Sequence, residues 1–139
     1  MSGANPIERV ARYLNLLGKK FKWNKENQMF LVEEKIDDKK VEITVGFTRN
    51  WLYIRLNFGS IKNLPDNIKY KLFKRCLEIN MEYAEVSFAL DKEENLLSEE
   101  DILLEALTLD VFVEEYNAVL VSARIYDEEL KPIISESKG

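Results

Sequence analysis

The sequence contains no histidine and a single cysteine, Cys76. Without histidine it cannot build a Ser-His or Cys-His catalytic pair, and one thiol alone cannot supply a His/Cys zinc site. Five glycines are too widely spaced for a Gly-rich phosphate loop or a G-x-G-x-x-G motif: Gly3, Gly18, Gly46, Gly59 and Gly139. Several common enzyme classes, and nucleotide binding by these two routes, are therefore excluded.

Long apolar runs are also missing. No stretch approaches the roughly 18 residues of a membrane-spanning helix, and the N-terminus lacks the basic and apolar regions of a signal peptide. One cysteine cannot form an intrachain disulfide, which fits a reducing compartment. The 139 residues, 46% of them hydrophobic, suffice for one core. We therefore expect a soluble, cytoplasmic protein with one domain over residues 1–134 and a disordered tail at 135–139.

The net charge of −5 is unevenly distributed along the chain. Residues 1–75 hold 16 Lys and Arg against 8 Asp and Glu, a net charge of +8, and residues 76–139 hold 4 against 17, a net charge of −13. Either these charges are solvated and meet across the fold, or they orient self-association or bind a charged partner.

Alternating apolar and polar residues over 41–47 and 52–58, joined by Thr48-Arg49-Asn50, predict a β-hairpin. One face is apolar, and the other presents Trp51, Tyr53 and Arg55, which are residue types typical of binding hot spots. Either a helix or other strands cover these three side chains as a second small core, or they bind a partner.

Helical spacing of apolar residues predicts three helices. The first spans 6–21, with Asn5 as its cap, Pro6 at its first position and the Lys19, Lys20 and Lys22 cluster at its end. The others span 65–80 and 109–129, the last ending before Pro132. Further strands are expected at 29–36 and 86–90, and at 101–107, where a helix beginning at Ser98 is the alternative.

The predicted helix at 65–80 is apolar around more than half its circumference. Ile68, Leu72, Cys76 and Ile79 form one stripe, and a second stripe beside it contains Tyr70, Phe73, Leu77 and Met81. A helix on a sheet needs one apolar stripe only somewhat wider than about 100°. The excess implies an interface, either with another subunit or with another helix of the chain.

The resulting order, helix, three strands, helix, two strands, helix, describes an α+β domain with an antiparallel sheet of about five strands. This order resembles the type III secretion chaperone-like fold, which includes the YbjN-like family. The apolar pattern around Leu64-Pro65, Leu72, Leu77 and Asn80, and around Ile102-Leu103-Leu104, carries the resemblance. It implies a small, non-enzymatic, protein-binding homodimer, possessing no cofactor, with Tyr70, Phe73, Leu77 and Met81 at the dimer interface.

Other candidate sites have ordinary structural explanations. Acidic residues between 91 and 101 lack the glycine and spacing of a calcium loop, so we interpret them as a solvated loop: Asp91, Glu93, Glu94, Glu99, Glu100 and Asp101. Cys76 lies on an apolar stripe and is expected to be an inert buried thiol. Glu33-Glu34 and Asp37-Asp38 lack a neighbouring nucleophile or cation, so we expect no enzyme.

A nucleic-acid-binding accessory protein is the alternative function. Its basis is an N-terminal basic segment with interleaved aromatics, Arg9, Arg12, Lys19, Lys20, Phe21, Lys22, Trp23 and Lys25. Such a segment can neutralise phosphates and stack on bases. The isoelectric point of about 5.0 favours protein binding instead, because a dedicated nucleic-acid binder is expected above about 9.

Overall fold

The computed structural model describes residues 5–138 and contains a six-stranded sheet and helices that confirm the α+β class. The helices and strands follow in this order: α1 (Pro6–Leu16), β1 (Lys20–Asn24), β2 (Met29–Ile36), β3 (Lys39–Phe47), β4 (Trp51–Ser60), α2 (Asp66–Glu82), β5 (Phe88–Leu90), β6 (Asn95–Leu103), a 3₁₀ turn (Leu104–Ala106), α3 (Leu109–Ile125), a π-helical segment (Tyr126–Leu130), α4 (Lys131–Ser135) and a last 3₁₀ turn (Glu136–Lys138).

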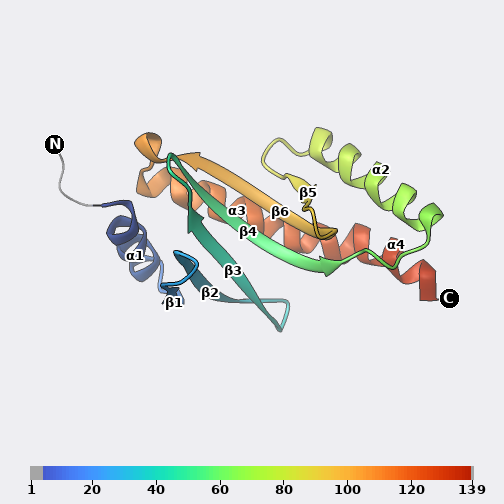
Figure 1. Cartoon of the computed structure of the whole chain (residues 1–139), viewed down its shortest axis with the longest axis horizontal. Helices are drawn as coiled ribbons and strands as arrows, with labels where there is room; N and C mark the ends of the chain where they lie inside the picture. Colours follow the sequence, from blue (N-terminus) through green and yellow to red (C-terminus); the bar gives the residue numbers. More distant parts are fainter. Residues whose placement is uncertain (1–4, 139) are drawn as a thin grey trace.

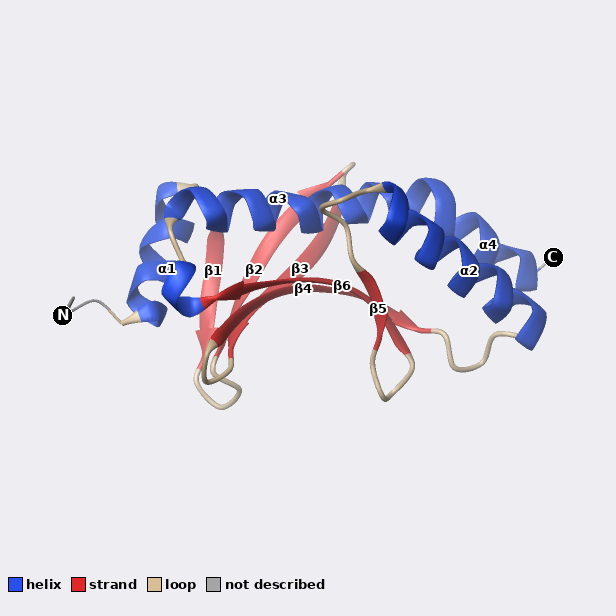
Figure 2. Ribbon diagram, turned by 90° about the horizontal axis from the view of Figure 1, so that it is seen from above, coloured by secondary structure: helices blue, strands red, loops and turns tan. Residues whose placement is uncertain are grey.

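The strands form one antiparallel sheet in the order β1-β2-β3-β4-β6-β5 (Figure 1). In Figure 2 the sheet is strongly curved, and the helices lie on one side of it. The opposite face, which we call the outer face, carries no helix among residues 5–138. The sheet therefore has one face covered by helices and one face that no helix of the described residues covers.

The predicted helix at 6–21 is wrong at its C-terminal end, because α1 stops at Leu16. Gly18 adopts the left-handed conformation (φ 70°), and the N–H of Lys19 donates to the carbonyl of Leu14 at 3.0 Å. A helix end of this kind, with a glycine in the left-handed conformation, provides hydrogen-bond donors for the last carbonyl groups of the helix. It also frees the alternating residues 20–24 to form β1, a strand that the prediction missed. The N-terminal cap is confirmed, since the Asn5 side chain accepts from the N–H of Glu8 at 2.8 Å.

The hairpin of β3 and β4 is confirmed, as is the strand at 29–36. Asp37 and Asp38, with φ of 48° and 68°, make the tight turn that joins β2 to β3. The apolar face of the hairpin lies in the core beneath the helices, where its central residues are buried: Ile43, Val45, Leu52 and Ile54.

Two boundaries in the C-terminal half also differ from the prediction. The segment expected to be a strand at 101–107 is a strand only at its start, because β6 spans Asn95–Leu103 and a 3₁₀ turn follows at Leu104–Ala106. The helix expected to end before Pro132 continues into α4, whose first turn contains Pro132. A proline is tolerated there because the first turn of a helix needs no backbone donor. Helical turns reach Lys138 in the segment where we expected a disordered tail, and Gly139 lies outside the described residues.

Side chains pack into two apolar clusters on the helix side of the sheet. The larger lies between α1, α3 and strands β2 to β4, and the smaller lies between α2, β5 and the C-terminal helical segments. A polar contact is buried where β6 meets α3, since the Ser122 hydroxyl donates to that of Ser98 at 2.5 Å. Glu34 accepts a hydrogen bond from the Tyr116 hydroxyl at 2.6 Å and pairs with Lys19 at 2.8 Å.

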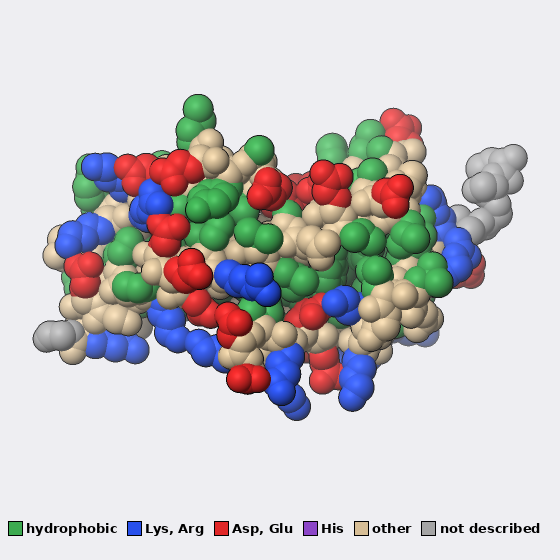
Figure 3. All heavy atoms as spheres, turned by 180° about the vertical axis from the view of Figure 1, so that it is seen from behind, with side chains coloured by type: hydrophobic (Ala, Val, Ile, Leu, Met, Phe, Trp, Pro, Cys, Tyr) green, Lys and Arg blue, Asp and Glu red, His purple; other side chains and the backbone are tan. Residues whose placement is uncertain are grey.

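The two oppositely charged halves of the chain meet across the fold. Five ion pairs join residues 1–75 to elements that follow α2: Lys39 with Asp127, Arg55 with Glu99, Lys69 with Glu94, Lys71 with Glu136, and Arg75 with Glu129. Figure 3 shows acidic and basic side chains interspersed on the helix side, with hydrophobic groups between them. The first interpretation of the charge asymmetry, contact within the fold, accounts for these pairs.

Candidate functional site

The outer face of β4 carries the three side chains singled out in the sequence. Opposite them, β3 contributes Thr44 and Gly46, and β6 contributes Glu99, Asp101 and Leu103. Among the residues described, no helix covers this row, so it does not form a second closed core. Trp51 is 46% exposed, while Tyr53 and Arg55 are half-buried.

Close contacts hold the row in place. The Tyr53 ring lies over Gly46, where an added Cβ would come within 2.3 Å of the ring carbon Cζ. The Arg55 guanidinium lies 4.6 Å from the centre of the Tyr53 ring and donates from Nε to Glu99 Oε1 at 2.5 Å. Cation–π and charge-assisted contacts of this kind reduce side-chain freedom before any partner binds.

These side chains line a shallow hollow of about 350 Å³, the aromatic depression, bounded by Thr48, Trp51, Tyr53, Arg55, Glu99 and Asp101. Burial raises the pKa of the Asp101 carboxyl to about 6, with a further contribution from the charge of Glu99, while Arg55 opposes the shift. The depression thus combines aromatic surface with two carboxylates and one cation. Such a surface suits the mixed apolar and charged side chains of a polypeptide.

Two residues of the depression, Glu99 and Asp101, were interpreted from the sequence as part of a solvated acidic loop. They lie instead on β6, where their alternation places both beside the aromatic row. Asp91 belongs to the turn before β6, where its carboxylate accepts from the N–H groups of Glu93 and Asn95 at 3.0 and 2.8 Å. Within residues 5–138, no group of three or more acidic or thiol side chains is arranged to hold a metal ion.

The two predicted stripes of α2 have different environments. The first is buried against β5 and the C-terminal helical segments: Ile68, Leu72, Cys76 and Ile79. The second, which we call the α2 stripe, consists of Tyr70, Phe73, Leu77 and Met81. Tyr70, Leu77 and Met81 are 66%, 69% and 87% exposed, and Phe73 is half-buried.

The α2 stripe continues onto the edge of the sheet. Phe73 and Leu77 line an apolar groove of about 240 Å³ together with Phe88, Leu90 and Leu96. Asn80 closes part of the β5 edge, because its side chain accepts from the Phe88 N–H at 2.8 Å and donates to the Phe88 carbonyl at 3.0 Å. The exposed apolar surface of α2 is therefore joined to that of Leu90.

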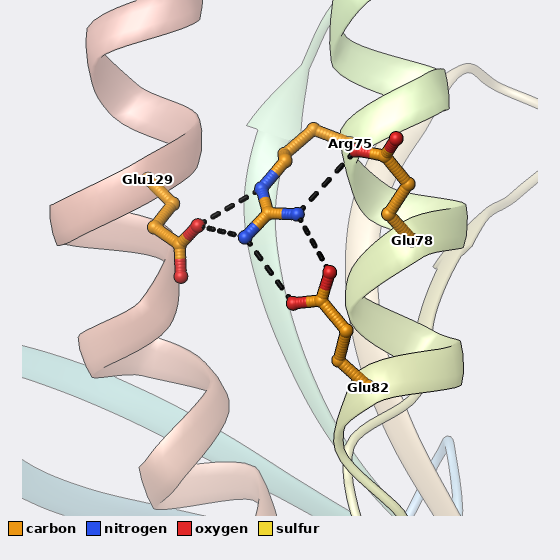
Figure 4. A network of polar contacts seen from close by, with 4 residues as sticks. All are labelled: Arg75, Glu78, Glu82 and Glu129. Carbon is orange, nitrogen blue, oxygen red and sulfur yellow. Dashed lines mark hydrogen bonds and ion pairs between the residues drawn. The ribbon is translucent and has the colours of Figure 1, made fainter.

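Ion pairs connect α2 to the π-helical segment Tyr126–Leu130. Figure 4 shows Arg75 between Glu78 and Glu82 of its own helix and Glu129 of the π-helical segment. Its Nε donates to Glu129 at 2.9 Å and its Nη1 to Glu82 at 3.1 Å. These hydrogen bonds, led by the one to Glu129, raise the pKa of Arg75 above its usual value. The orientation of the α2 stripe is thus fixed by charge as well as by packing.

Cys76 lies on the buried side of α2. Burial raises the pKa of its thiol to about 12, so it stays protonated at neutral pH. Thiolate chemistry is suppressed at such a site.

The basic N-terminal segment does not present one continuous surface. Phe21 and Trp23 face the helix side of the sheet, where they pack on Phe30 with ring centres 5.5 and 4.7 Å apart. Lys20 and Lys22, at alternate positions of β1, face the outer side. The two rings are therefore unavailable for stacking beside these cations.

Comparisons with known proteins show the fold. No protein-family model matches the chain, and a search of curated proteins finds no match. A chain of the heterodimeric ExoU–SpcU complex of the Pseudomonas aeruginosa type III secretion system is similar, with a TM-score of 0.62 and 12% identity over 90% of this chain and 97% of that chain. YbjN of E. coli, described as a putative transcription regulator, has a TM-score of 0.58 and 13% identity over 95% and 90%.

The Yersinia pestis type III secretion chaperone SycH, in complex with a fragment of YscM2, is similar with a TM-score of 0.52 and 14% identity, covering 91% of this chain and 99% of that chain. The chain therefore has the fold shared by type III secretion chaperones and YbjN, as the resemblance in its sequence implied. None of the helices within residues 5–138 combines the length and the hydrophobicity that spanning a bilayer would require.

Proposed function

We propose that this protein is a non-enzymatic, chaperone-like protein-binding module that acts as a homodimer. The observation that carries the proposal is the presence of two separate exposed surfaces, the apolar α2 stripe and the aromatic depression with its hot-spot residue types Trp51, Tyr53 and Arg55. The similar type III secretion proteins were solved in complexes with other proteins, which supports a polypeptide partner.

The α2 stripe is the proposed dimer interface. Three large apolar side chains lie exposed along one line of the helix, and the apolar groove at Phe88 and Leu90 extends the surface. A contiguous apolar patch of this kind is uncommon on a monomer. Pairing of two α2 helices across a twofold axis would bury the same residues on both subunits.

Changing Leu77 and Met81 to Lys tests the dimer. Both side chains are mostly exposed in one chain, so the double variant should stay folded while four added charges in the dimer oppose association. Sedimentation velocity should show a dimer for the unaltered protein and a monomer for the variant. The matched control, Asn63→Lys with Asn67→Lys, adds the same number of charges at exposed positions just before and in the first turn of α2 and should remain dimeric. A wild-type protein that is monomeric at high concentration contradicts the proposal.

The aromatic depression is the proposed client site. Trp51 supplies exposed aromatic area, and Tyr53 and Arg55 are already held by Gly46 and Glu99. Preorganised aromatic and arginine side chains lose little entropy on binding.

Affinity capture from the native host, followed by mass spectrometry, tests the client site. Trp51→Ala and Tyr53→Ala should lose the same captured proteins, which Arg49→Ala, an exposed neighbour in the hairpin loop, should retain. Retention of every captured protein by both aromatic variants would show that the depression does not bind the client, independently of the oligomeric state.

A further inference from the structure

The strands β3 and β4 are joined over only part of their length. Their register runs from Phe47 opposite Leu52 to Thr44 opposite Arg55 and ends there. β3 nevertheless begins at Lys39 and β4 continues to Ser60, and Figure 1 shows the two strands running apart beyond the paired segment. A hollow of about 580 Å³, which we call the β3–β4 cleft, lies between the unpaired parts.

The peptide groups of Lys40 and Glu42 point into this cleft. In an antiparallel ladder, successive residues of a strand direct their N–H and C=O groups to opposite sides. The tight turn at 37–38 sets Val41 and Ile43 to bond with β2, and the Thr48 N–H that donates to the Trp51 carbonyl at 2.8 Å sets Thr44 and Gly46 to bond with β4. Both constraints direct Lys40 and Glu42 toward the cleft.

Within the described residues, β3 has no strand partner beside Lys40 and Glu42 on this side, so two donors and two acceptors are free along its edge. The facing edge of β4 is partly closed, because the Asn57 side chain accepts from the Gly59 N–H at 2.8 Å. A free strand edge is a template for pairing with another chain. β3 is therefore the edge that a partner strand can join.

The floor and rim of the cleft define what it can accept. The floor is aromatic, with Phe58 stacked on Tyr126 at a ring-centre distance of 4.2 Å and an angle of 11°. Three lysines stand at the rim, Lys39, Lys40 and Lys131.

The rim has an excess of positive charge. Lys39 pairs with Asp127 at 3.7 Å, and Glu42 is the other carboxylate lining the cleft. Lys39 and Lys131 lie so close together that the neighbouring Lys39 lowers the pKa of Lys131. An added carboxylate would be attracted to this rim, because three cations face two anions.

We propose that the β3–β4 cleft binds an extended segment of a partner protein, which pairs with the edge of β3 at Lys40 and Glu42 and presents an acidic side chain to the lysine rim. Alternate side chains of an added strand point to opposite faces. The set on the helix side would lie on Phe58 and Tyr126 beside Lys131, and the set on the outer face would meet Lys40, so an acidic residue of either set faces a lysine. This site is separate from the α2 stripe and the aromatic depression, and it can be tested whether or not the proposed function holds.

The first test uses amide hydrogen exchange measured by NMR. In the free protein, the Glu42 amide should exchange rapidly and the neighbouring Ile43 amide, which bonds to β2, should be protected. A synthetic peptide of about seven residues, with valine alternating with aspartate and threonine, serves as the probe. At millimolar concentration it should slow exchange at Glu42. Protection of Glu42 in the free protein, or no change with the peptide, overturns the proposal.

Fluorescence anisotropy with the labelled peptide separates strand pairing from charge attraction. A peptide N-methylated at alternate residues, on the side that would face β3, loses the donors for strand pairing and should bind about tenfold more weakly. The protein variant Lys40→Glu with Lys131→Glu should also bind about tenfold more weakly. Lys20→Glu with Lys22→Glu, the same two charge reversals at exposed positions of β1, should bind normally.

Equal binding of the N-methylated and unmodified peptides would refute strand pairing. Inorganic phosphate supplies a further comparison, because it carries charge but no backbone. If phosphate displaces the peptide and the peptide protects no amide, the cleft is an anion site only and the proposal is wrong.

Discussion

Replacement of Glu100 by Gln should stabilise the protein at high pH. Glu100 lies opposite Ile54, so its side chain is on the helix side of β6, where α3 brings Glu115 close. Burial, followed by the charge of Glu115, raises the pKa of Glu100 to about 8. Burial likewise raises the pKa of Glu115, while a hydrogen bond with Glu100 opposes the shift. The protonated Glu100 carboxyl therefore donates to the Glu115 carboxylate.

The sign of the pH effect follows from proton binding. An unfolded glutamate has a pKa of about 4.3, so between that pH and about 8 the folded chain holds a proton that the unfolded chain has released. The free energy of unfolding must fall as the pH rises through this window, and this contribution is fully present only below about pH 4.3. One pKa unit corresponds to about 1.4 kcal/mol, so the whole shift corresponds to roughly 5 kcal/mol.

Solvent screening reduces this value, because the carboxyl is only partly enclosed. We expect the wild type to lose about 2 kcal/mol of stability between pH 5 and pH 9 through this group. Glu100→Gln keeps a donor for Glu115 and cannot ionise, so it should exceed the wild type by about 2 kcal/mol at pH 9 and match it at pH 5.

Guanidinium unfolding followed by tryptophan fluorescence, at several pH values between 5 and 9, measures the difference. Glu105→Gln, an exposed glutamate in the 3₁₀ turn after β6, is the matched control and should follow the wild type. Asp101, whose pKa is raised to about 6, contributes at the lower end of this window in both proteins. Parallel loss of stability in the wild type and Glu100→Gln would refute the buried-carboxyl explanation.

Two further substitutions test contacts described above. Gly46→Ala should displace the Tyr53 ring, because the new Cβ would lie within 2.3 Å of it. The near-ultraviolet circular dichroism spectrum should change while the far-ultraviolet spectrum does not. An unchanged near-ultraviolet spectrum would contradict the packing of the Tyr53 ring on Gly46. Arg75→Gln should destabilise the protein by about 1 kcal/mol at low salt and by less in 1 M NaCl, as measured by urea unfolding, because it removes a screened network of ion pairs. A salt-independent loss would mean that Arg75 acts through packing.

Apolar residues that recur at every second position predicted most strands, and apolar residues at helical spacing predicted most helices. Both patterns arise because each strand or helix buries one face. The hairpin and the two stripes of α2 followed from that rule. β1 was missed because a lysine cluster favours a helix end, although Phe21 and Trp23 alternate with lysines as a strand requires. The decisive residue was Gly18, whose left-handed conformation depends on the hydrogen bonds around it.

The sites were harder to predict than the elements. The aromatic row of β4 was visible in the sequence, but its carboxylate neighbours were not, because β6 is brought beside β4 from about 45 residues away. The β3–β4 cleft has no local signature at all. It arises where two strands with regular alternation stop pairing, which is a property of sheet curvature rather than of any residue type.

The ion pairs between the two halves of the chain also bear on how the protein is made. When a ribosome has released only residues 1–75, the nascent chain carries a net charge of +8 and lacks β6 and α3, which cover β4 and the core. Such an intermediate is cationic and has uncovered apolar strands, so it should adhere to ribosomal RNA or to other chains. When the acidic second half is added, it completes the sheet and neutralises this charge at the same time. A chain truncated within α2 should therefore be insoluble or bound to RNA.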